Sequence, residues 1–157
     1  MAKFGKDDVK VLQTNKKAFF NYEIVEDLEC GIALTGTEVK SIRQGRFSFS
    51  DSYVKIDSDG LKLIAFTIQP YTHGNIHNHK PERIRRLLAQ KQEIKRLTRK
   101  VDEKGLTLIP TKVYLRGNLV KVQVSLARGK QLHDKRASIK ERDVSRDIRR
   151  ELKQSNF

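Results

Sequence analysis

The residues with the clearest chemical potential lie near the end of the chain, in the segment Gly129–Arg136, which reads GKQLHDKR. Its cationic side chains can contact phosphates, and the imidazole of His133 can stack on an exposed base or donate to a phosphate. A strand-like run, residues 120–127, precedes the segment, with valine and leucine alternating against polar residues. We therefore predict an extended nucleic-acid contact made by Gly129, Lys130, His133, Asp134, Lys135 and Arg136. The alternative is a solvated basic linker. Charge alone does not distinguish this linker from a nucleic-acid contact.

The same segment is poorly arranged for catalysis. His133 and Asp134 are residue types found in acid–base dyads, but adjacent side chains on an extended chain point apart. No paired nucleophile is evident, so we expect that the protein is not an enzyme. A nuclease that uses His133 or the histidine-rich loop described next is a competing hypothesis. Incubating labelled RNA with and without a divalent metal would eliminate it if no cleavage appears.

A histidine-rich loop, residues 71–79, is the candidate for metal binding. His73, His77 and His79 are spaced so that all three could lie on one side of the loop. A carboxylate ligand is not obvious beside them, and structural zinc usually takes four well-spaced ligands. The single Cys30 cannot form an internal disulfide or a cysteine-based zinc site, and we read it as a small residue near the core. We expect a solvated loop, no metal and no cofactor.

Four carboxylates lie in strand-rich regions, and nothing in the sequence pairs them for acid–base catalysis. They are Glu23, Glu29, Glu38 and Asp51. In a protein this basic, a glutamate is more informative as an acceptor for a guanine edge or a ribose hydroxyl. For Glu23 and Asp51 an ordinary surface charge near lysines is the competing interpretation.

The charge of the chain points to a polyanionic partner. Lysine and arginine number 33 against 19 aspartate and glutamate, a net charge of +14. The excess is concentrated in residues 80–104 and 128–157, each of which carries ten basic residues. Neutralising phosphates with such side chains releases counterions and gives salt-dependent affinity. A membrane surface fits less well, because the basic segments lack an aromatic face. The first ten residues hold no apolar signal core, so we expect a cytoplasmic protein.

The elements that must position these residues are mostly short strands. We predict one domain with a flexible arm at residues 1–13, a folded body at residues 14–128 and a basic tail at residues 129–157. Strand-like sequence begins at Lys17, a short capped helix follows Thr35 and ends near Gly45, and hairpins turn at residues 58–60 and 116–118.

Two stretches have helical spacing. Apolar residues between Pro81 and Val101 predict one kinked helix or two helices ending at Gly105. The tail, residues 138–153, carries only a sparse apolar stripe on a charged helix, which is marginal alone in water. We expect the tail to be disordered when free and helical when bound, and NMR of a rigid tail packed on the free body would contradict this.

About six short antiparallel strands with turn signals suggest a small closed barrel. An oligonucleotide-binding (OB) barrel would present a curved face to nucleic acid. Periodicity alone does not separate that barrel from a β-sandwich with helices, and Pro110 argues for an edge or a bulge within its strand.

Several of these motifs, in this order, resemble the SsrA-binding protein family, also called small protein B (SmpB). The resemblance covers roughly residues 14–142, and its motifs are highly specific together although each is weak alone. The matching stretches are residues 15–18, 29–41, 51–54, Arg83, residues 85–88, 129–130 and 133–136.

The resemblance implies an OB-like barrel of six antiparallel strands flanked by about three helices. It implies an adaptor of trans-translation that binds the tRNA-like domain of transfer-messenger RNA and delivers it to stalled ribosomes. The partners would be that RNA, elongation factor Tu with the alanylated RNA, and the small-subunit decoding centre, with the protein acting as a monomer. The tail would enter the vacant messenger channel. The RNA face would be formed by Asn15, Lys16, Glu29, Leu88 and Lys121.

A second hypothesis is that the protein binds ribosomal RNA in general. The charge and the strand pattern support this hypothesis without the family motifs. It predicts similar affinity for transfer RNA, ribosomal RNA fragments and duplex RNA, because phosphates would supply most of the binding free energy.

Overall fold

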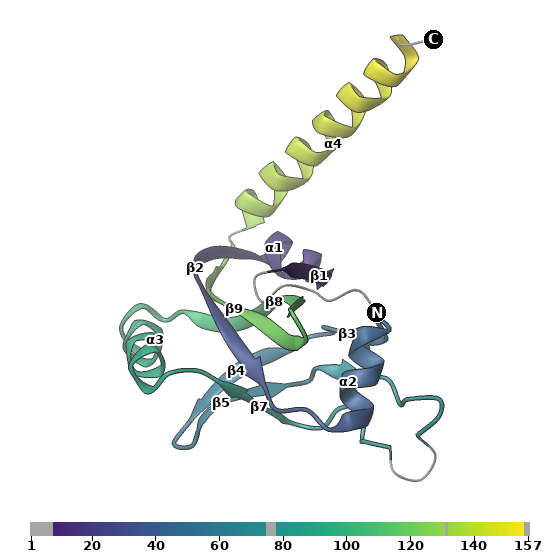
Figure 1. The fold of residues 1–157 in the computed structure, drawn as a ribbon. Helices are drawn as coiled ribbons and strands as arrows, with labels where there is room; N and C mark the ends of the chain where they lie inside the picture. Colours follow the sequence, from purple (N-terminus) through teal and green to yellow (C-terminus); the bar gives the residue numbers. More distant parts are fainter. Residues whose placement is uncertain (1–7, 75–77, 131, 156–157) are drawn as a thin grey trace.

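The structure, a computed structural model, describes residues 8–74, 78–130 and 132–155. Figure 1 shows a strand-built body from which one long helix projects. Six strands close into a ring in the order β8–β4–β5–β7–β2–β9, because β9 pairs with β8 as well as with β2. Their bounds are Tyr22–Ile32 (β2), Tyr53–Asp57 (β4), Gly60–Ile64 (β5), Arg85–Leu88 (β7), Thr107–Arg116 (β8) and Leu119–Gly129 (β9). All ring pairings are antiparallel, which confirms the predicted six-stranded barrel.

The barrel interior follows from period-two alternation. Val120, Val122, Val124 and Leu126 of β9 all point into the core, as the sequence predicts. The register of β8 against β9 shifts between Pro110 and Lys112, so the proline lies at the predicted bulge. The two predicted hairpins are also confirmed, since β4 joins β5 and β8 joins β9.

Three short strands lie outside the ring. β1 (Val9–Thr14) pairs with β8 along residues 112–116, so the prediction of a flexible arm is wrong for residues 9–13. The reason is that pairing with β8 largely decides the conformation of β1: Val9 and Val11 remain about half exposed, at 49% and 50%, while Leu12 is partly buried against the core. β3 (Phe47–Ser48) and β6 (Thr67–Ile68) form a separate two-stranded sheet.

The described residues form four helices, and three of them flank the barrel. These are α1 (Lys16–Asn21), α2 (Gly36–Arg43) and α3 (Lys91–Lys104). The predicted helix start at Thr35 is confirmed: the Thr35 N–H donates to a Glu38 carboxylate oxygen at 2.9 Å. α3 ends at Gly105, which has a φ of 60° and takes the left-handed conformation that glycine allows.

Two local predictions are wrong. Residues 17–21 are helical rather than extended, because the Asn15 side chain caps α1 by accepting from the Ala18 N–H at 3.1 Å. The helix predicted from Pro81 starts only at Lys91, because residues 85–88 form β7 between β5 and β2. Residues 85–88 form a strand because they close the ring of strands. Their burial alternates as it does in a strand, with Leu87 buried and Leu88 exposed.

The fourth helix, α4 (Leu132–Ser155), carries the tail away from the body, as Figure 1 shows. Its apolar stripe, Ile139, Val144, Ile148 and Leu152, is between 46% and 59% exposed and covers no core. The helical tail without a core face therefore agrees with the sequence, while its disorder in the free protein stays a prediction. Within the described residues, no helix has the length and hydrophobicity needed to span a membrane.

A buried ion pair joins α2 to the barrel. The side chains of Glu38 and Arg85 are both fully buried, and Arg85 Nε donates to Glu38 Oε2 at 2.5 Å. Arg85 also donates to the carbonyl oxygens of Phe66 and Pro81, at 2.5 and 3.0 Å. Burial opposes ionisation of Glu38, but hydrogen bonds from Arg83, the Thr35 N–H and Arg85 outweigh it and lower the pKa of Glu38.

We expect Glu38→Gln to lower the free energy of unfolding by about 3–5 kcal/mol, since it leaves a buried guanidinium without its counter-charge. Urea unfolding at pH 7 measures this. Because the folded pKa of Glu38 is lowered, its contribution is present above the unfolded pKa and is lost as the pH falls through the folded pKa. Asp51→Asn is the matched control: it removes the exposed Lys17–Asp51 pair and should change stability little. Equal effects of the two substitutions would contradict the role given to Glu38.

Candidate nucleic-acid interface

One outer face of the barrel gathers residues that the sequence analysis singled out. On β2, Gly31 pairs with Leu88 of β7 on one side and with Lys121 of β9 on the other. Lys121 pairs in turn with Tyr114 of β8. Glu29 lies two residues before Gly31 on β2 and so projects from the same face. We call Glu29, Leu88, Tyr114, Arg116 and Lys121 the Glu29 face.

The carboxylate of Glu29 is held in place by two partners from β8. Tyr114 Oη donates to it at 2.5 Å, and Arg116 Nη2 donates to the same oxygen at 2.7 Å. Hydrogen bonds from Arg116 and then Tyr114 lower the pKa of Glu29, and nearby Lys121 adds to the effect. The side chain of Glu29 remains 35% exposed, so an ionised, oriented acceptor faces solvent.

An apolar groove of about 310 Å³, lined in part by Gly31 and Lys121, lies between Leu88 and the start of β9. Leu88 is 53% exposed, although its neighbour Leu87 is buried. The side chain of Leu88 crosses over Gly31, where an added Cβ would lie 3.2 Å from the Leu88 Cβ. Glycine at position 31 thus lets the leucine lie flat across the strand, next to Lys121. Three of the predicted RNA-face residues, Glu29, Leu88 and Lys121, are therefore brought together.

The other two predicted residues lie across the sheet from Glu29, where β1 ends and α1 begins. Thr14 of β1 pairs with Lys112, and Lys112 pairs with Gln123, the partner of Glu29. Asn15 follows and is buried. Its amide nitrogen donates to the Pro110 carbonyl at 2.9 Å, while its amide oxygen caps α1. Asn15 therefore fixes the direction of α1, and its neighbour Lys16 is exposed.

The tail begins with an anchored segment. β9 runs through Gly129, which pairs with Tyr22, one residue beyond the predicted end of the body. Lys130 donates its backbone N–H to the Asn21 carbonyl at 3.0 Å and its ammonium to the Phe19 carbonyl at 3.2 Å. Arg142 of α4 then lies over the Phe20 ring, 5.3 Å from its centre. The first part of the tail is thus tied to α1.

The other predicted tail residues belong to the first turns of α4. The backbones of His133, Asp134 and Lys135 are helical, so the prediction of an extended chain is wrong for these residues. Their side chains lie outside the described part of the structure. Arg136 is exposed.

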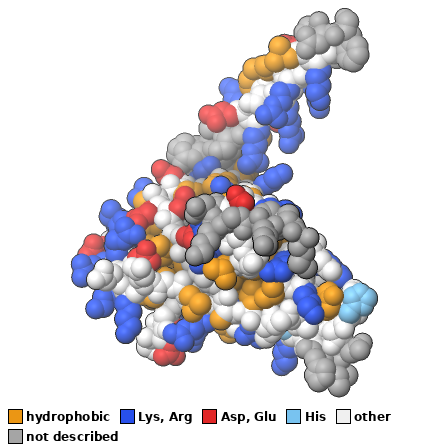
Figure 2. All heavy atoms as spheres, in the orientation of Figure 1, with side chains coloured by type: hydrophobic (Ala, Val, Ile, Leu, Met, Phe, Trp, Pro, Cys, Tyr) orange, Lys and Arg blue, Asp and Glu red, His pale blue; other side chains and the backbone are white. Residues whose placement is uncertain are grey.

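Basic side chains follow the tail and a second surface. Figure 2 shows lysine and arginine side chains along α4 and over the side of the body formed by α3. The exposed cations of α3 are Lys91, Lys95, Arg96, Arg99 and Lys104. Arg96 and Lys100 also pair with Glu26 of β2, which ties α3 to the barrel. The two charge-rich segments of the sequence thus become two surfaces.

The described histidines and Cys30, the other residues considered for metal binding or catalysis, make contacts that belong to the fold. His79 contacts the Thr37 hydroxyl and the Ile68 carbonyl through its two ring nitrogens, each at 2.9 Å. His73 packs its ring against Tyr71, while His77 lies outside the described residues. Across residues 8–74, 78–130 and 132–155, no three histidine, cysteine or acidic side chains cluster as metal ligands would. Burial raises the pKa of the Cys30 thiol to about 12, which confirms a core residue.

Sequence reasoning missed the partners of Glu29. Tyr114 and Arg116 lie 85 and 87 residues away, and only the pairing of β8, β9 and β2 joins them to the carboxylate. Their spacing of two residues in a predicted strand was the available signal, since it places both on one face. Sequence reasoning also missed a pocket beside α1.

Fold and surface together define the class of protein: a small, strongly basic OB-like barrel with one exposed acceptor face and a cationic helical extension. A model of the family described as SmpB protein matches residues 12–154. The chain belongs to this family.

Individual relatives agree. An SsrA-binding protein of Treponema denticola is 49% identical over 94% of this chain and 96% of its own length. One from Magnetococcus marinus is 49% identical over 92% and 96%. A solved chain described as "tmRNA-SmpB: a journey to the center of the bacterial ribosome" is similar with a TM-score of 0.64 and 46% identity, covering 78% of this chain and 85% of that one.

We expect Arg116→Gln to raise the pKa of Glu29 more than Tyr114→Phe does, because the Arg116 hydrogen bond is the largest cause of the lowered value. Titration of the Glu29 carboxyl carbon by NMR measures both shifts. In the unmodified chain the carboxylate should stay ionised as the pH falls through the ordinary glutamate range. Lys62→Gln, which breaks the separate Lys62–Asp57 pair, is the control and should leave the Glu29 titration unchanged. A larger shift in Tyr114→Phe would reverse the order proposed here.

Proposed function

We propose that this chain binds the tRNA-like domain of transfer-messenger RNA as the adaptor of trans-translation. The observation that carries the proposal is the Glu29 face: an oriented carboxylate beside an exposed leucine and a lysine, in a chain about half identical to SsrA-binding proteins. A carboxylate can accept from a guanine edge or a ribose hydroxyl, an apolar side chain can pack against an unstacked base, and a lysine can contact phosphate.

The adaptor role assigns different work to the two parts of the chain. The barrel holds the RNA, and the complex of elongation factor Tu with the alanylated RNA carries both to a stalled ribosome. The tail, with Gly129, Lys130, His133, Asp134, Lys135 and Arg136, enters the vacant decoding centre and messenger channel. The proposed work is binding and placement of RNA by a cytoplasmic monomer, which requires no covalent chemistry by the protein.

The helical tail suits this placement. α4 contacts the body near α1, and its remaining length is exposed and cationic. A lone charged helix is marginal in water, but an RNA-lined channel supplies phosphates for its lysines and arginines. A messenger RNA would compete for the same space. Ordering of the tail would therefore report that the channel is vacant, which is the condition that calls for rescue.

General binding of ribosomal RNA remains the second candidate, and the basic surface of α3 favours it. This surface lies outside the Glu29 face and carries five exposed cations. Phosphate contacts of this kind strengthen binding to any RNA and are weakened by salt.

We expect the purified chain to prefer the isolated tRNA-like domain over an ordinary transfer RNA, and to keep that preference when the salt concentration is raised. Base and shape contacts survive salt better than phosphate contacts do, so affinity for both RNAs should fall while their ratio persists. Equilibrium binding at two salt concentrations measures this.

Glu29→Gln tests whether the preference comes from the Glu29 face. It keeps the shape of the side chain, removes its charge and should reduce the preference about tenfold, the effect of losing a charge-assisted hydrogen bond. Glu103→Gln changes the net charge equally on exposed α3 and should leave the preference intact. Equal binding of the two RNAs that collapses with salt would instead favour the general RNA binder.

Deleting residues 129–157 should spare binding to the tRNA-like domain and abolish rescue, because the Glu29 face lies wholly within the barrel. RNA affinity and peptide tagging on stalled ribosomes are the two readouts. A deletion from residue 144 onward is a useful intermediate, since it retains the anchor formed by Lys130 and Arg142. Tagging by the chain that lacks all of residues 129–157 would rule out the tail mechanism.

A further inference from the structure

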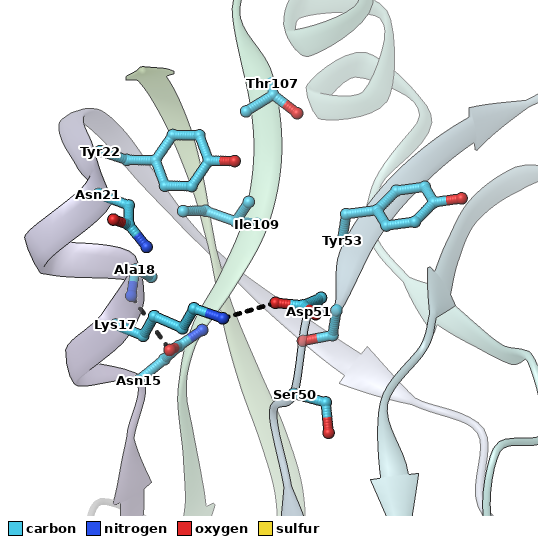
Figure 3. Close-up of a pocket in the computed structure, with 11 residues that line it drawn as sticks. Asn15, Lys17, Ala18, Asn21, Tyr22, Ser50, Asp51, Tyr53, Thr107 and Ile109 are labelled. Carbon is cyan, nitrogen blue, oxygen red and sulfur yellow. Dashed lines mark hydrogen bonds and ion pairs between the residues drawn. The ribbon is translucent and has the colours of Figure 1, made fainter. Parts of the chain in front are cut away.

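A pocket separate from the Glu29 face lies between α1, the turn before β4 and the start of β8. Its volume is about 280 Å³, and no residue of the Glu29 face lines it. Small-molecule sites in proteins usually measure about 300–1,000 Å³, so this one suits a single flat ring system. Figure 3 shows Tyr22 and Tyr53 on opposite sides of the pocket, with Thr107 and Ile109 between them.

The walls of the pocket are suited to an aromatic guest. Tyr53, at the start of β4, is 45% exposed although its neighbour Val54 is buried in the core. Tyr22 is partly buried at the start of β2, and Ile109 provides a buried apolar floor. Tyrosine rings beside an apolar floor are what RNA-binding proteins use to stack bases that have left a helix.

A buried hydroxyl in the pocket lacks a partner. Ser52 is only 7% exposed, and its Oγ has no hydrogen-bond partner in the described part of the structure. Buried polar groups are nearly always paired, so an unpaired one that lines a pocket marks a place for a polar ligand atom. The turn fixes the position of Ser52, because its backbone N–H donates to the Phe49 carbonyl at 2.9 Å. Asn21 and Thr107 place further polar side chains in the lining.

The rim of the pocket carries a lysine, Lys17, whose ammonium group can leave its present ion-pair partner. Lys17 pairs with Asp51 at 2.7 Å, as the dashed line in Figure 3 shows, and both side chains are well exposed. Such a surface pair contributes little to stability. Lys17 can therefore turn from Asp51 to a phosphate, and Lys16 beside it is also exposed. A nucleotide fits this arrangement, with its base inside the pocket and its phosphate at the rim.

We propose that the Tyr22–Tyr53 pocket binds one unstacked nucleobase of an RNA partner, as a second contact besides the Glu29 face. The ligand class is a base in single-stranded or looped RNA, stacked on tyrosine and hydrogen-bonded at its edge by Ser52. The inference rests on the proposed function only in taking RNA as the partner.

The test compares a uridine oligoribonucleotide with an abasic oligomer that carries the same number of phosphates, at a salt concentration that suppresses phosphate-only binding. The full chain should bind the uridine oligomer about tenfold more tightly, the scale of one stacked base. Tyr53→Ala should remove this preference and Tyr53→Phe should keep it, because phenylalanine retains the ring. Tyr71→Ala, a tyrosine outside the pocket, is the matched control and should keep the preference. A preference unchanged in Tyr53→Ala would overturn the proposal.

Ser52→Ala separates ligand binding from a structural role. Removing an unpaired buried hydroxyl should leave the melting temperature unchanged or higher, while the base preference falls about threefold. A base preference equal to that of the unmodified chain would show that Ser52 makes no contact with the base and would overturn its assignment.

Failure of this proposal is distinguishable from failure of the proposed function. Loss of the base preference in Tyr53→Ala, in a chain that binds the tRNA-like domain and ordinary transfer RNA equally, would support the pocket and refute the adaptor role. Selective binding of the tRNA-like domain with an unchanged base preference in Tyr53→Ala would refute the pocket alone.

Discussion

The buried pair of Glu38 and Arg85 is the interaction on which the recognition surface depends. Arg85 lies on β7, the strand that closes the ring between β5 and β2, and its guanidinium binds α2 and the backbone at Phe66 and Pro81. Removing two charges from water is costly, and only full satisfaction of their hydrogen bonds offsets that cost. Since β7 places Leu88 opposite Gly31, this pair, together with the pairing of β7 to β5 and β2, holds the apolar half of the Glu29 face in place.

Much of the barrel was predictable, because local sequence and final structure agree in the hairpins. β8 and β9 alternate apolar and polar residues and enclose a glycine turn, so neither strand needs a distant partner to be recognised. Residues 85–88 behave differently. Their apolar spacing fits a helix, and only pairing with β5 and β2 makes them a strand. β1 shows the same limit, because its conformation depends on pairing with β8 and its two valines stay about half exposed.

The sequence indicated three residues of the candidate site but not its geometry. The family motifs identify Glu29, Leu88 and Lys121, and strand register then explains why they meet across three neighbouring strands. The support of Glu29 by Tyr114 and Arg116 depends on side-chain direction in a closed sheet, which composition does not encode. Asn15 shows the reverse: its motif position suggested an RNA contact, while its amide oxygen and nitrogen serve α1 and β8.

The barrel and the tail differ in how far their structure is fixed before a ligand binds. In the proposed function, the barrel recognises the RNA and the tail senses a vacant messenger channel. On the barrel, hydrogen bonds fix Glu29 before any ligand arrives, so little conformational entropy is lost on binding. On the tail, the apolar stripe of α4 is about half exposed and most of its cations face solvent, so we expect its order to depend on its surroundings. A preorganised face gives selectivity for one RNA shape. Under the proposed function, a conditionally ordered helix would add binding free energy only where a complementary anionic channel is empty, and it would so couple delivery to vacancy.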